Sequence, residues 1–228
     1  MELRENERID ELGRRGYRIL QKKEGFRFGM DAVLLSWFAQ VREGERVIDL
    51  GTGTGIIPIL MDARNNCGTY IGLELQKEMA ELASRSVRLN QIEDHMRIEE
   101  GDIRTASVRF GRGSFQVVTS NPPYMNDANG LINENRSLAI ARHEILCNLD
   151  DVAAAAGHIL KTGGRFYMIH RPHRLAEIFE CLRAHRLEPK RMQLVHPHIG
   201  DNANMVLIEA RKNEGAFLKV EKPIIVYS

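Results

Sequence analysis

The residues best suited to chemistry form the run Ser120-Asn121-Pro122-Pro123-Tyr124, which directly follows a stretch predicted to be a buried strand. The Asn121 side chain and the Pro122 backbone each offer a carbonyl oxygen that can accept a hydrogen bond from an amino group. The prolines fix φ and remove competing N–H donors, and Tyr124 offers a flat face on which a nucleobase can stack. The run therefore suits an exocyclic amino group of a nucleobase. The lone pair of such a group is delocalised into the ring, and hydrogen-bond acceptors on the NH2 group draw it back onto nitrogen.

A glycine-rich turn follows an earlier predicted strand, with Gly51, Gly53 and Gly55 in the turn and Asp49 just before it. Glycine lacks a Cβ, so the backbone can turn tightly and approach a ligand closely. The spacing is G-x-G-x-G rather than the G-x-G-x-x-G of dinucleotide binders, which disfavours a dehydrogenase. Taken alone, the turn is also compatible with a plain connection between a strand and a helix.

Acidic residues follow the next two predicted strands. Glu74 lies 23 residues after Gly51, close to the interval of about 20 residues at which an acid reaches ribose hydroxyls. A carboxylate suits that role because it can accept hydrogen bonds from two vicinal hydroxyls. Asp102 follows the third strand, and either acid alone could instead cap a helix. Acids and glycines at successive strand ends together predict a nucleoside-containing cofactor.

Strands and helices alternate from Arg46 onwards, which predicts a parallel sheet covered by helices on both faces. The predicted strands are 46–50, 69–74, 96–100, 115–120, 165–170, 192–196 and 205–211, and the predicted helices are 30–38, 56–63, 76–89, 149–161 and 172–185. The last two strands have no helix between them and should form an antiparallel hairpin. A chain of 228 residues fits one α/β domain, with an N-terminal extension (1–45) before a core (46–228).

Composition limits the partners, the compartment and the metal sites to be expected for the protein. The formal net charge is only +1, although 14–27 and 161–198 are locally basic and could contact RNA or simply be solvated. No segment approaches the roughly 20 apolar residues of a membrane span. The three cysteines lie far apart, which indicates a reducing cytoplasm rather than a disulfide framework. No Cys or carboxylate completes the close histidine pairs 170/173 and 196/198, so we expect no metal.

The glycine turn and strand layout resemble those of class I methyltransferases, and the Asn-Pro-Pro-Tyr run is similar to a motif of amino-methyltransferases. Those enzymes act on adenine N6, cytosine N4 or protein glutamine N5, so the motif indicates the acceptor atom and not the substrate. Three further stretches resemble the bacterial tRNA1(Val) adenine-37 N6-methyltransferases over nearly the whole chain. They are Phe26–Leu35, Ala141-Arg142-His143-Glu144 and His170-Arg171-Pro172-His173-Arg174-Leu175.

The resemblance implies a Rossmann-like, mostly parallel sheet of seven strands, S-adenosyl-L-methionine as cofactor and an RNA substrate, with tRNA favoured. Residues 1–45 would fold over the cofactor, and Asp102 and Ile103 would hold its adenine. The full cofactor set is Phe28, Asp31, Asp49, Gly51, Thr52, Gly53, Gly55, Glu74, Leu75, Asp102, Ile103 and Asn121. The catalytic set is Asn121, Pro122, Pro123 and Tyr124, and the substrate set is Tyr124, Arg136, Arg142 and His143.

Other functions remain open at this point. A protein glutamine N5-methyltransferase of the release-factor type shares the tetrapeptide, but such proteins resemble one another in a separate N-terminal helical domain, for which 45 residues are too few. An rRNA adenine N6-methyltransferase, a small-molecule methyltransferase and a binding module without catalysis are further alternatives. The polar segment 125–137 is predicted to be a lid over the target base, with Arg136 and Arg142 available to phosphates. The oligomeric state is left open.

Overall fold

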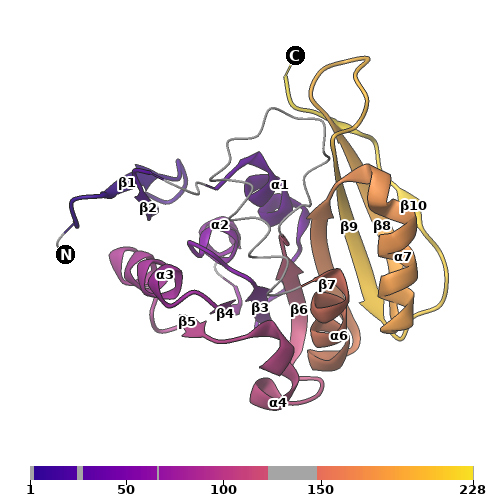
Figure 1. The fold of residues 1–228 in the computed structure, drawn as a ribbon, viewed down its shortest axis with the longest axis horizontal. Helices are drawn as coiled ribbons and strands as arrows, with labels where there is room; N and C mark the ends of the chain where they lie inside the picture. Colours follow the sequence, from indigo (N-terminus) through magenta and orange to yellow (C-terminus); the bar gives the residue numbers. More distant parts are fainter. Residues whose placement is uncertain (1–2, 25–27, 66, 123–147, 228) are drawn as a thin grey trace.

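The computed structural model describes residues 3–24, 28–65, 67–122 and 148–227. Its centre is a mixed sheet in which, over these residues, the strand order is β10-β8-β9-β7-β6-β3-β4-β5, with β11 also paired to β8 (Figure 1). The strands of this sheet are β3 (Arg46–Leu50), β4 (Thr69–Glu74), β5 (Met96–Glu100), β6 (Phe115–Ser120), β7 (Leu160–His170), β8 (Leu187–His196), β9 (Met205–Lys212), β10 (Lys219–Val220) and β11 (Ile224–Ile225).

The pairing of the strands follows the sequence prediction in its main features. Strands β5, β4, β3, β6 and β7 are parallel neighbours. Strand β9 pairs antiparallel with both β7 and β8, which confirms the predicted C-terminal hairpin. Strands β10 and β11, with two residues each, run parallel to β8 along its outer edge. They were not predicted, because two residues leave no periodic pattern in the sequence.

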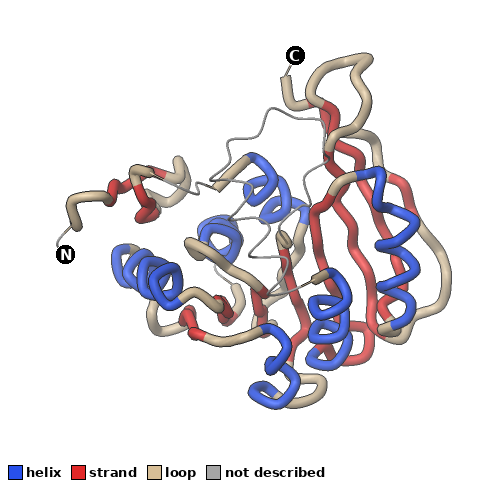
Figure 2. Tube along the Cα trace, viewed as in Figure 1, coloured by secondary structure: helices blue, strands red, loops and turns tan. Residues whose placement is uncertain are grey.

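Helices cover both faces of the sheet, giving three layers (Figure 2). The helices are α1 (Met30–Phe38), α2 (Ile56–Asn65), α3 (Lys77–Leu89), α4 (Ala106–Phe110), α6 (Leu149–Ile159) and α7 (Leu175–Ala184), and the 3-10 turns are η1 (Ile103–Thr105) and η2 (Pro172–Arg174). Helices α1, α2 and α3 share one apolar cluster with the sheet, and α4, α6 and α7 share another. In the part of the chain described, none of these helices is both long and apolar enough to span a bilayer.

The central strands are buried on both faces, as the continuous apolar runs predicted. In β3, for example, Val47 belongs to the cluster under α1 and α2, whereas Ile48 and Leu50 belong to the cluster under α6. This alternation leaves the strand ends, rather than the strand faces, as the places where polar groups can gather. The two clusters therefore hold the sheet rigid beneath the loops at its edges.

Several predicted boundaries are wrong: β7 and β8 begin at Leu160 and Leu187 rather than at Arg165 and Met192, and the helix predicted for 172–185 is the 3-10 turn η2 followed by α7. We expected the helix that begins at Leu149 to run to Lys161 and to stop at Gly163-Gly164. It ends at Ile159 instead, because Leu160 is extended (φ −70°, ψ 140°) and starts β7 by pairing with Phe115. The Leu160 side chain is buried there, so core packing outweighs local helix propensity.

The N-terminal segment contains a hairpin that the charged sequence did not reveal. Strands β1 (Glu7–Glu11) and β2 (Arg18–Lys22) pair antiparallel around a turn in which Gly13 and Gly16 have positive φ (66° and 67°). The hairpin packs on α3, where the Leu20 amide donates to Ser86 Oγ (3.0 Å). The placement of residues 1–45 over the cofactor stays a prediction.

A buried ion pair fastens this hairpin. Glu7 Oε1 lies 2.6 Å from Arg85 Nη1 of α3, and both side chains are less than a tenth exposed. Removing one member of a buried pair leaves the other charge uncompensated, which typically costs about 3–5 kcal/mol. Glu7→Ala should therefore lower the protection of β2 amides in native-state hydrogen exchange by a free energy in that range. Glu81→Ala, which breaks the exposed pair with Arg4, should cost about 1 kcal/mol or less; equal effects would contradict this assignment.

Candidate active site

The predicted site residues gather where β3 and β6 end. These strands are parallel neighbours with Leu50 beside Ser120, so the loops that follow them leave the sheet side by side. Strand β4 lies on the far side of β3, and β7 lies on the far side of β6. The chain therefore leaves β3 toward β4 on one side and leaves β6 toward β7 on the other side. In open α/β sheets, ligands bind in the crevice between two connections that diverge in this way.

The glycine turn after β3 has the conformation that its sequence predicts. Gly51, Gly53 and Gly55 all have positive φ (75°, 57° and 79°), which side chains rarely tolerate. The amides of Gly51 and Thr52 both donate to the Leu73 carbonyl of β4 (2.9 and 3.0 Å). A Cβ on Gly53 would meet nothing within 4 Å, so the turn leaves open space beside its backbone.

Glu74, at the end of β4, is tied directly to this turn. One carboxylate oxygen accepts from the Gly53 amide (2.8 Å), and the other accepts from the Gln76 amide (2.9 Å). The side chain is only 5% exposed. Each carboxylate oxygen has a second lone pair, so Glu74 can support the turn and still accept from ligand hydroxyls.

Asp49 lies beneath the turn and is almost fully buried. Its Oδ1 accepts from the Thr119 hydroxyl (2.6 Å). Burial disfavours the charged carboxylate and raises the pKa of Asp49 to about 7, although the hydrogen bond from Thr119 opposes this rise. In strict hydrogen-bond geometry, Asp49 Oδ2 and the hydroxyls of Thr52 and Thr54 have no partner among the described residues, but the Thr52 hydroxyl also lies close enough to Asp49 to oppose the rise in its pKa.

Asp102 and its neighbours line the next strand end. The Asp102 carboxylate accepts from the Arg104 amide (2.9 Å) and pairs with the Arg104 guanidinium, and this hydrogen bonding lowers its pKa. Arg104 was not predicted as a partner of Asp102. A ligand that binds the Asp102 carboxylate would have to share it with Arg104. Ile103 Cδ1 would lie 3.7 Å from a Cβ on Gly51, so it borders the turn, and Leu75 is exposed.

Asn121 and Asp31 are 90 positions apart in the chain and meet at this edge. The Asn121 amide nitrogen donates to Asp31 Oδ2 (3.0 Å). Asp31 lies in the first turn of α1, where its Oδ1 accepts from the Ala32 amide (2.9 Å). Pro122 is buried. Helix α1 thereby fixes the orientation of the amide that the sequence analysis placed at the reaction centre.

Other predicted residues lie elsewhere or outside the described part of the chain. Phe28 is half-buried and lines a pocket with Trp37 and Leu60, between the β1–β2 turn and helices α1 and α2. Its predicted cofactor contact stays a prediction. Outside the described residues lie Pro123, Tyr124, Arg136, Arg142, His143 and the whole predicted lid, 125–137.

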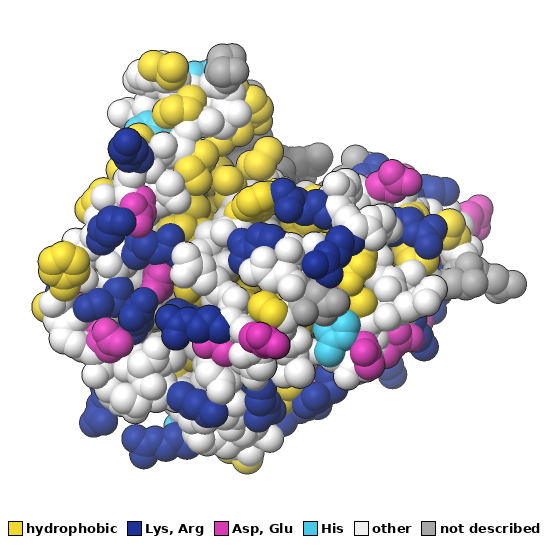
Figure 3. Space-filling view, turned by 180° about the vertical axis from the view of Figure 1, so that it is seen from behind, with side chains coloured by type: hydrophobic (Ala, Val, Ile, Leu, Met, Phe, Trp, Pro, Cys, Tyr) yellow, Lys and Arg dark blue, Asp and Glu magenta, His cyan; other side chains and the backbone are white. Residues whose placement is uncertain are grey.

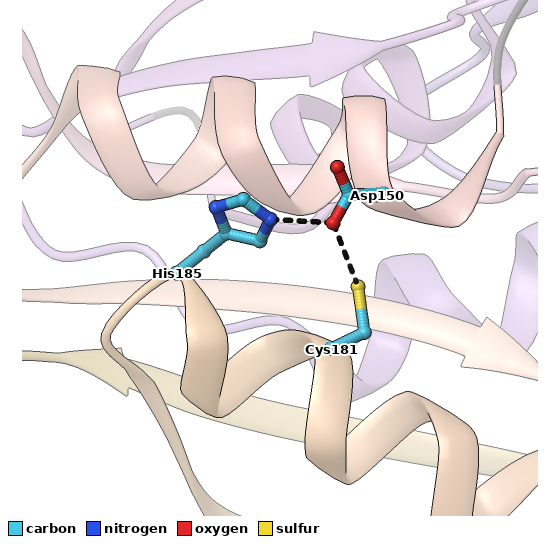
Figure 4. Close-up of side chains that lie close together, drawn as sticks. All are labelled: Asp150, Cys181 and His185. Carbon is cyan, nitrogen blue, oxygen red and sulfur yellow. Dashed lines mark hydrogen bonds and ion pairs between the residues drawn. The ribbon is translucent and has the colours of Figure 1, made fainter.

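Three possible metal ligands from the start of α6 and the end of α7 lie together (Figure 4). His185 Nε2 and Cys181 Sγ lie 2.7 and 3.8 Å from the same oxygen of Asp150. The sequence analysis considered only histidine pairs and missed this cluster, although Cys181 and His185 have the i, i+4 spacing that brings side chains together on a helix. The hydrogen bonds already satisfy the carboxylate oxygen, and the cluster takes no part in the site described above.

Comparison with known proteins identifies the family. A model of the methyltransferase small domain matches residues 29–185, which is more than half of the chain. The chain belongs to this family. A solved structure of a predicted O-methyltransferase from Agrobacterium tumefaciens has a TM-score of 0.69 at 28% identity, covering 86% of this chain and 87% of that one. The fold is thus that of the class I methyltransferases, as predicted.

Curated relatives agree with the family. One from Flavobacteriaceae bacterium (strain 3519-10) is 30% identical over 154 residues, which cover 67% of this chain and 63% of the relative. Another from Aeromonas salmonicida (strain A449) is 29% identical over 182 residues, covering 79% of this chain and 74% of the relative. Both are named tRNA1(Val) (adenine(37)-N6)-methyltransferase. The match with the first spans less than two thirds of that relative's length.

Family and fold are those of methyltransferases, and the cofactor expected from the sequence is S-adenosyl-L-methionine. The residues present fit this cofactor. The glycine turn exposes backbone beside open space, and Glu74 offers acceptors for ribose hydroxyls. The buried Thr54 hydroxyl, which has no partner among the described residues, is a polar group that a bound ligand, or water ordered by it, can satisfy.

The raised pKa of Asp49 predicts how cofactor affinity depends on pH. With a pKa of about 7, the group carries a proton below neutral pH. The cofactor is a sulfonium with an ammonium group, and nearby positive charge favours the carboxylate, so binding should release this proton. Calorimetric Kd should therefore fall as the pH rises from about 6 to about 8, and Asp49→Asn should flatten that profile. The same slope in both proteins would contradict the linkage.

Proposed function

We propose that this protein transfers a methyl group from S-adenosyl-L-methionine to N6 of an adenine in tRNA. The supporting relatives carry the name tRNA1(Val) (adenine(37)-N6)-methyltransferase, and we propose the same nucleotide as the target here. The observation that carries the proposal is the Asn121 amide, held by Asp31 at the end of β6 beside the glycine turn. A side-chain carbonyl fixed at that point suits an amino acceptor.

The chain's own part in the reaction is to hold and polarise this amino group. Because the Asn121 nitrogen donates to Asp31, its carbonyl oxygen is the atom that would accept from the exocyclic amine. The Pro122 backbone carbonyl would accept from the same NH2 group, and a buried proline keeps that carbonyl in place. The two acceptors draw the lone pair back onto nitrogen as the transition state forms. Asp31 positions Asn121, and its predicted contact with the cofactor stays a prediction.

The cofactor supplies an electrophilic methyl group on its sulfonium. We propose that the turn at Gly51 and Gly53 packs against its methionine part and that Glu74 accepts from its ribose hydroxyls. Asp102 would accept from the adenine amino group while keeping its bond to Arg104, and Leu75 and Ile103 would flank the ring. For Tyr124, Arg136, Arg142 and His143, contact with the RNA remains a proposal from sequence alone.

A strain that lacks the gene tests the proposed function. Its total tRNA, rRNA and protein are incubated with the purified chain and methyl-labelled cofactor, and the products are analysed by mass spectrometry. The proposal expects label in N6-methyladenosine of tRNA. Label in rRNA, in protein glutamine or in a small molecule, or on an oxygen acceptor, would overturn it in favour of one of the other methyltransferase classes.

A further inference from the structure

The end of the β8–β9 hairpin projects beyond the sheet on the side toward which β6 runs (Figure 1). Strands β6 and β7 are parallel with Ser120 beside Met168, and β7 and β9 are antiparallel with His170 beside Val206. The loop 197–204 therefore leaves the sheet on the side where β6 ends, but about four residues, or about 13 Å, further along, because Ser120 is level with Met168 and Ile208. With three strand spacings, about 14 Å, between β6 and β8, the loop lies about 20 Å from the end of β6, a distance that several nucleotides of an RNA loop can span.

Two aromatic rings lie exposed at this end. The rings of His198 and Tyr227 have centroids 5.3 Å apart with an interplanar angle of 35°. Next to them Ile199 is 83% exposed, and Tyr227 itself is 57% exposed. The projecting end accordingly carries hydrophobic and histidine side chains in the space-filling view (Figure 3). We call His198, Ile199 and Tyr227 the tip platform.

The backbone holds this platform in a defined geometry. The Tyr227 amide donates to the Pro197 carbonyl (2.8 Å), which fixes the C-terminal segment against the hairpin after β11 pairs with β8. His198 Nδ1 lies 3.0 Å from Asp201 Oδ2, and Gly200, with φ of 89°, allows the tight turn between these two residues. Such preorganised rings lose little conformational entropy when a ligand stacks on them.

The chemistry around the platform suits a nucleic acid better than a second protein. Stable protein interfaces need extended area, about 1,000 Å² or more, whereas here a few rings stand among polar groups. Asn202 and Asn204 are exposed on the same loop, and amide side chains can hydrogen-bond the edges of nucleobases. Arg171, whose guanidinium donates to the Asn204 carbonyl (2.9 Å), adds positive charge at the base of the hairpin.

We propose that the tip platform stacks an unpaired nucleobase several nucleotides away from the target base, so that the enzyme selects single-stranded RNA loops. This inference rests on the proposed function and deepens it. RNA-binding proteins recognise unstacked bases in this way, on aromatic faces with polar groups at the base edges. The platform would hold the strand while Asn121 receives the methylated base.

The test uses a stem-loop RNA with the target adenine in its loop and 2-aminopurine several nucleotides away in the same loop, added to the full chain with S-adenosylhomocysteine. Binding to the wild type should quench the 2-aminopurine fluorescence. Tyr227→Ala should abolish the quenching and weaken RNA affinity at least about fivefold, whereas Tyr227→Phe, which keeps the ring, should preserve both. Phe217→Ala is the matched control, since Phe217 is also exposed but follows the opposite end of β9.

The possible outcomes separate the two proposals. If the wild type binds the RNA and quenches its fluorescence, and Tyr227→Ala does the same, the platform is overturned. The proposed function is then left intact. Equal losses in Tyr227→Ala and Phe217→Ala would also overturn the platform, as would a concentration-dependent dimer that Tyr227→Ala dissolves. A wild type that binds no RNA at all would overturn the proposed function and the platform together.

Discussion

Asn121→Ala is expected to lower kcat for methyl transfer by at least about 100-fold, the scale on which losing one hydrogen bond to a transition state acts. Cofactor affinity should change little. The Asn121 carbonyl contacts the amine most strongly as the nitrogen rehybridises, so the loss belongs in kcat and not in Kd. Single-turnover assays at saturating RNA, with calorimetry for the cofactor, separate these two quantities.

Two further variants sharpen this result. Asp31→Ala removes the partner that orients the Asn121 amide and should give a smaller loss in the same parameter, since the amide remains but is no longer held. Asn213→Ala changes an exposed asparagine whose side chain bonds only to Thr162 among the described residues, and it should leave kcat as in the wild type. Near-normal turnover of Asn121→Ala would mean that the acceptor is not an amine held at this position.

Glu74→Ala should raise the Kd for S-adenosyl-L-methionine at least tenfold, a loss of about 1.4 kcal/mol or more. The substitution removes the carboxylate that is expected to accept from the ribose hydroxyls. It also removes the support of the turn, because this carboxylate accepts from the amides of Gly53 and Gln76. The affinity for S-adenosylhomocysteine, which shares the ribose, should fall by a similar factor. Isothermal calorimetry measures both constants.

The matched control is Glu78→Ala, four residues later. Glu78 lies in the first turn of α3 and pairs with Lys22 at the surface, so its loss should leave cofactor affinity unchanged. Glu74→Gln should lie between the two, because an amide oxygen can accept one of the hydrogen bonds. Unchanged affinity in Glu74→Ala would remove the ribose role from this residue.

Much of the fold could be predicted because the central strands are short apolar runs that end at polar or glycine residues. Strands β3, β4, β5 and β6 have the predicted bounds, since burial on both faces leaves little freedom in such runs. The predictions were weaker where tertiary contacts decide the structure. The β1–β2 hairpin is stabilised by Ser86, Arg85 and Asn90 of the α3 region, and these partners lie more than 60 positions away. Only the Gly13–Gly16 pair hinted at a turn.

In the candidate site too, some features follow from the sequence and others depend on tertiary contacts. The glycine turn and the acid at the end of β4 could be predicted, because strand ends in a parallel sheet must lie together. The contact of Asp31 with Asn121 could not, since it depends on where α1 packs against the sheet. Likewise, Arg104 follows Asp102 by only two residues, but nothing in that spacing shows that its side chain turns back onto the carboxylate.

Site-resolved mass spectrometry shows which atom of which nucleotide receives the methyl group. The purified chain is incubated with deuteromethyl-labelled cofactor and a tRNA1(Val) transcript, and nuclease fragments are sequenced by mass spectrometry. The account predicts one labelled methyl group, on N6 of adenine 37, the position named for the relatives, and none on a transcript with guanine at that position. Label on any other nucleotide, or label that persists on the guanine-containing transcript, would contradict it.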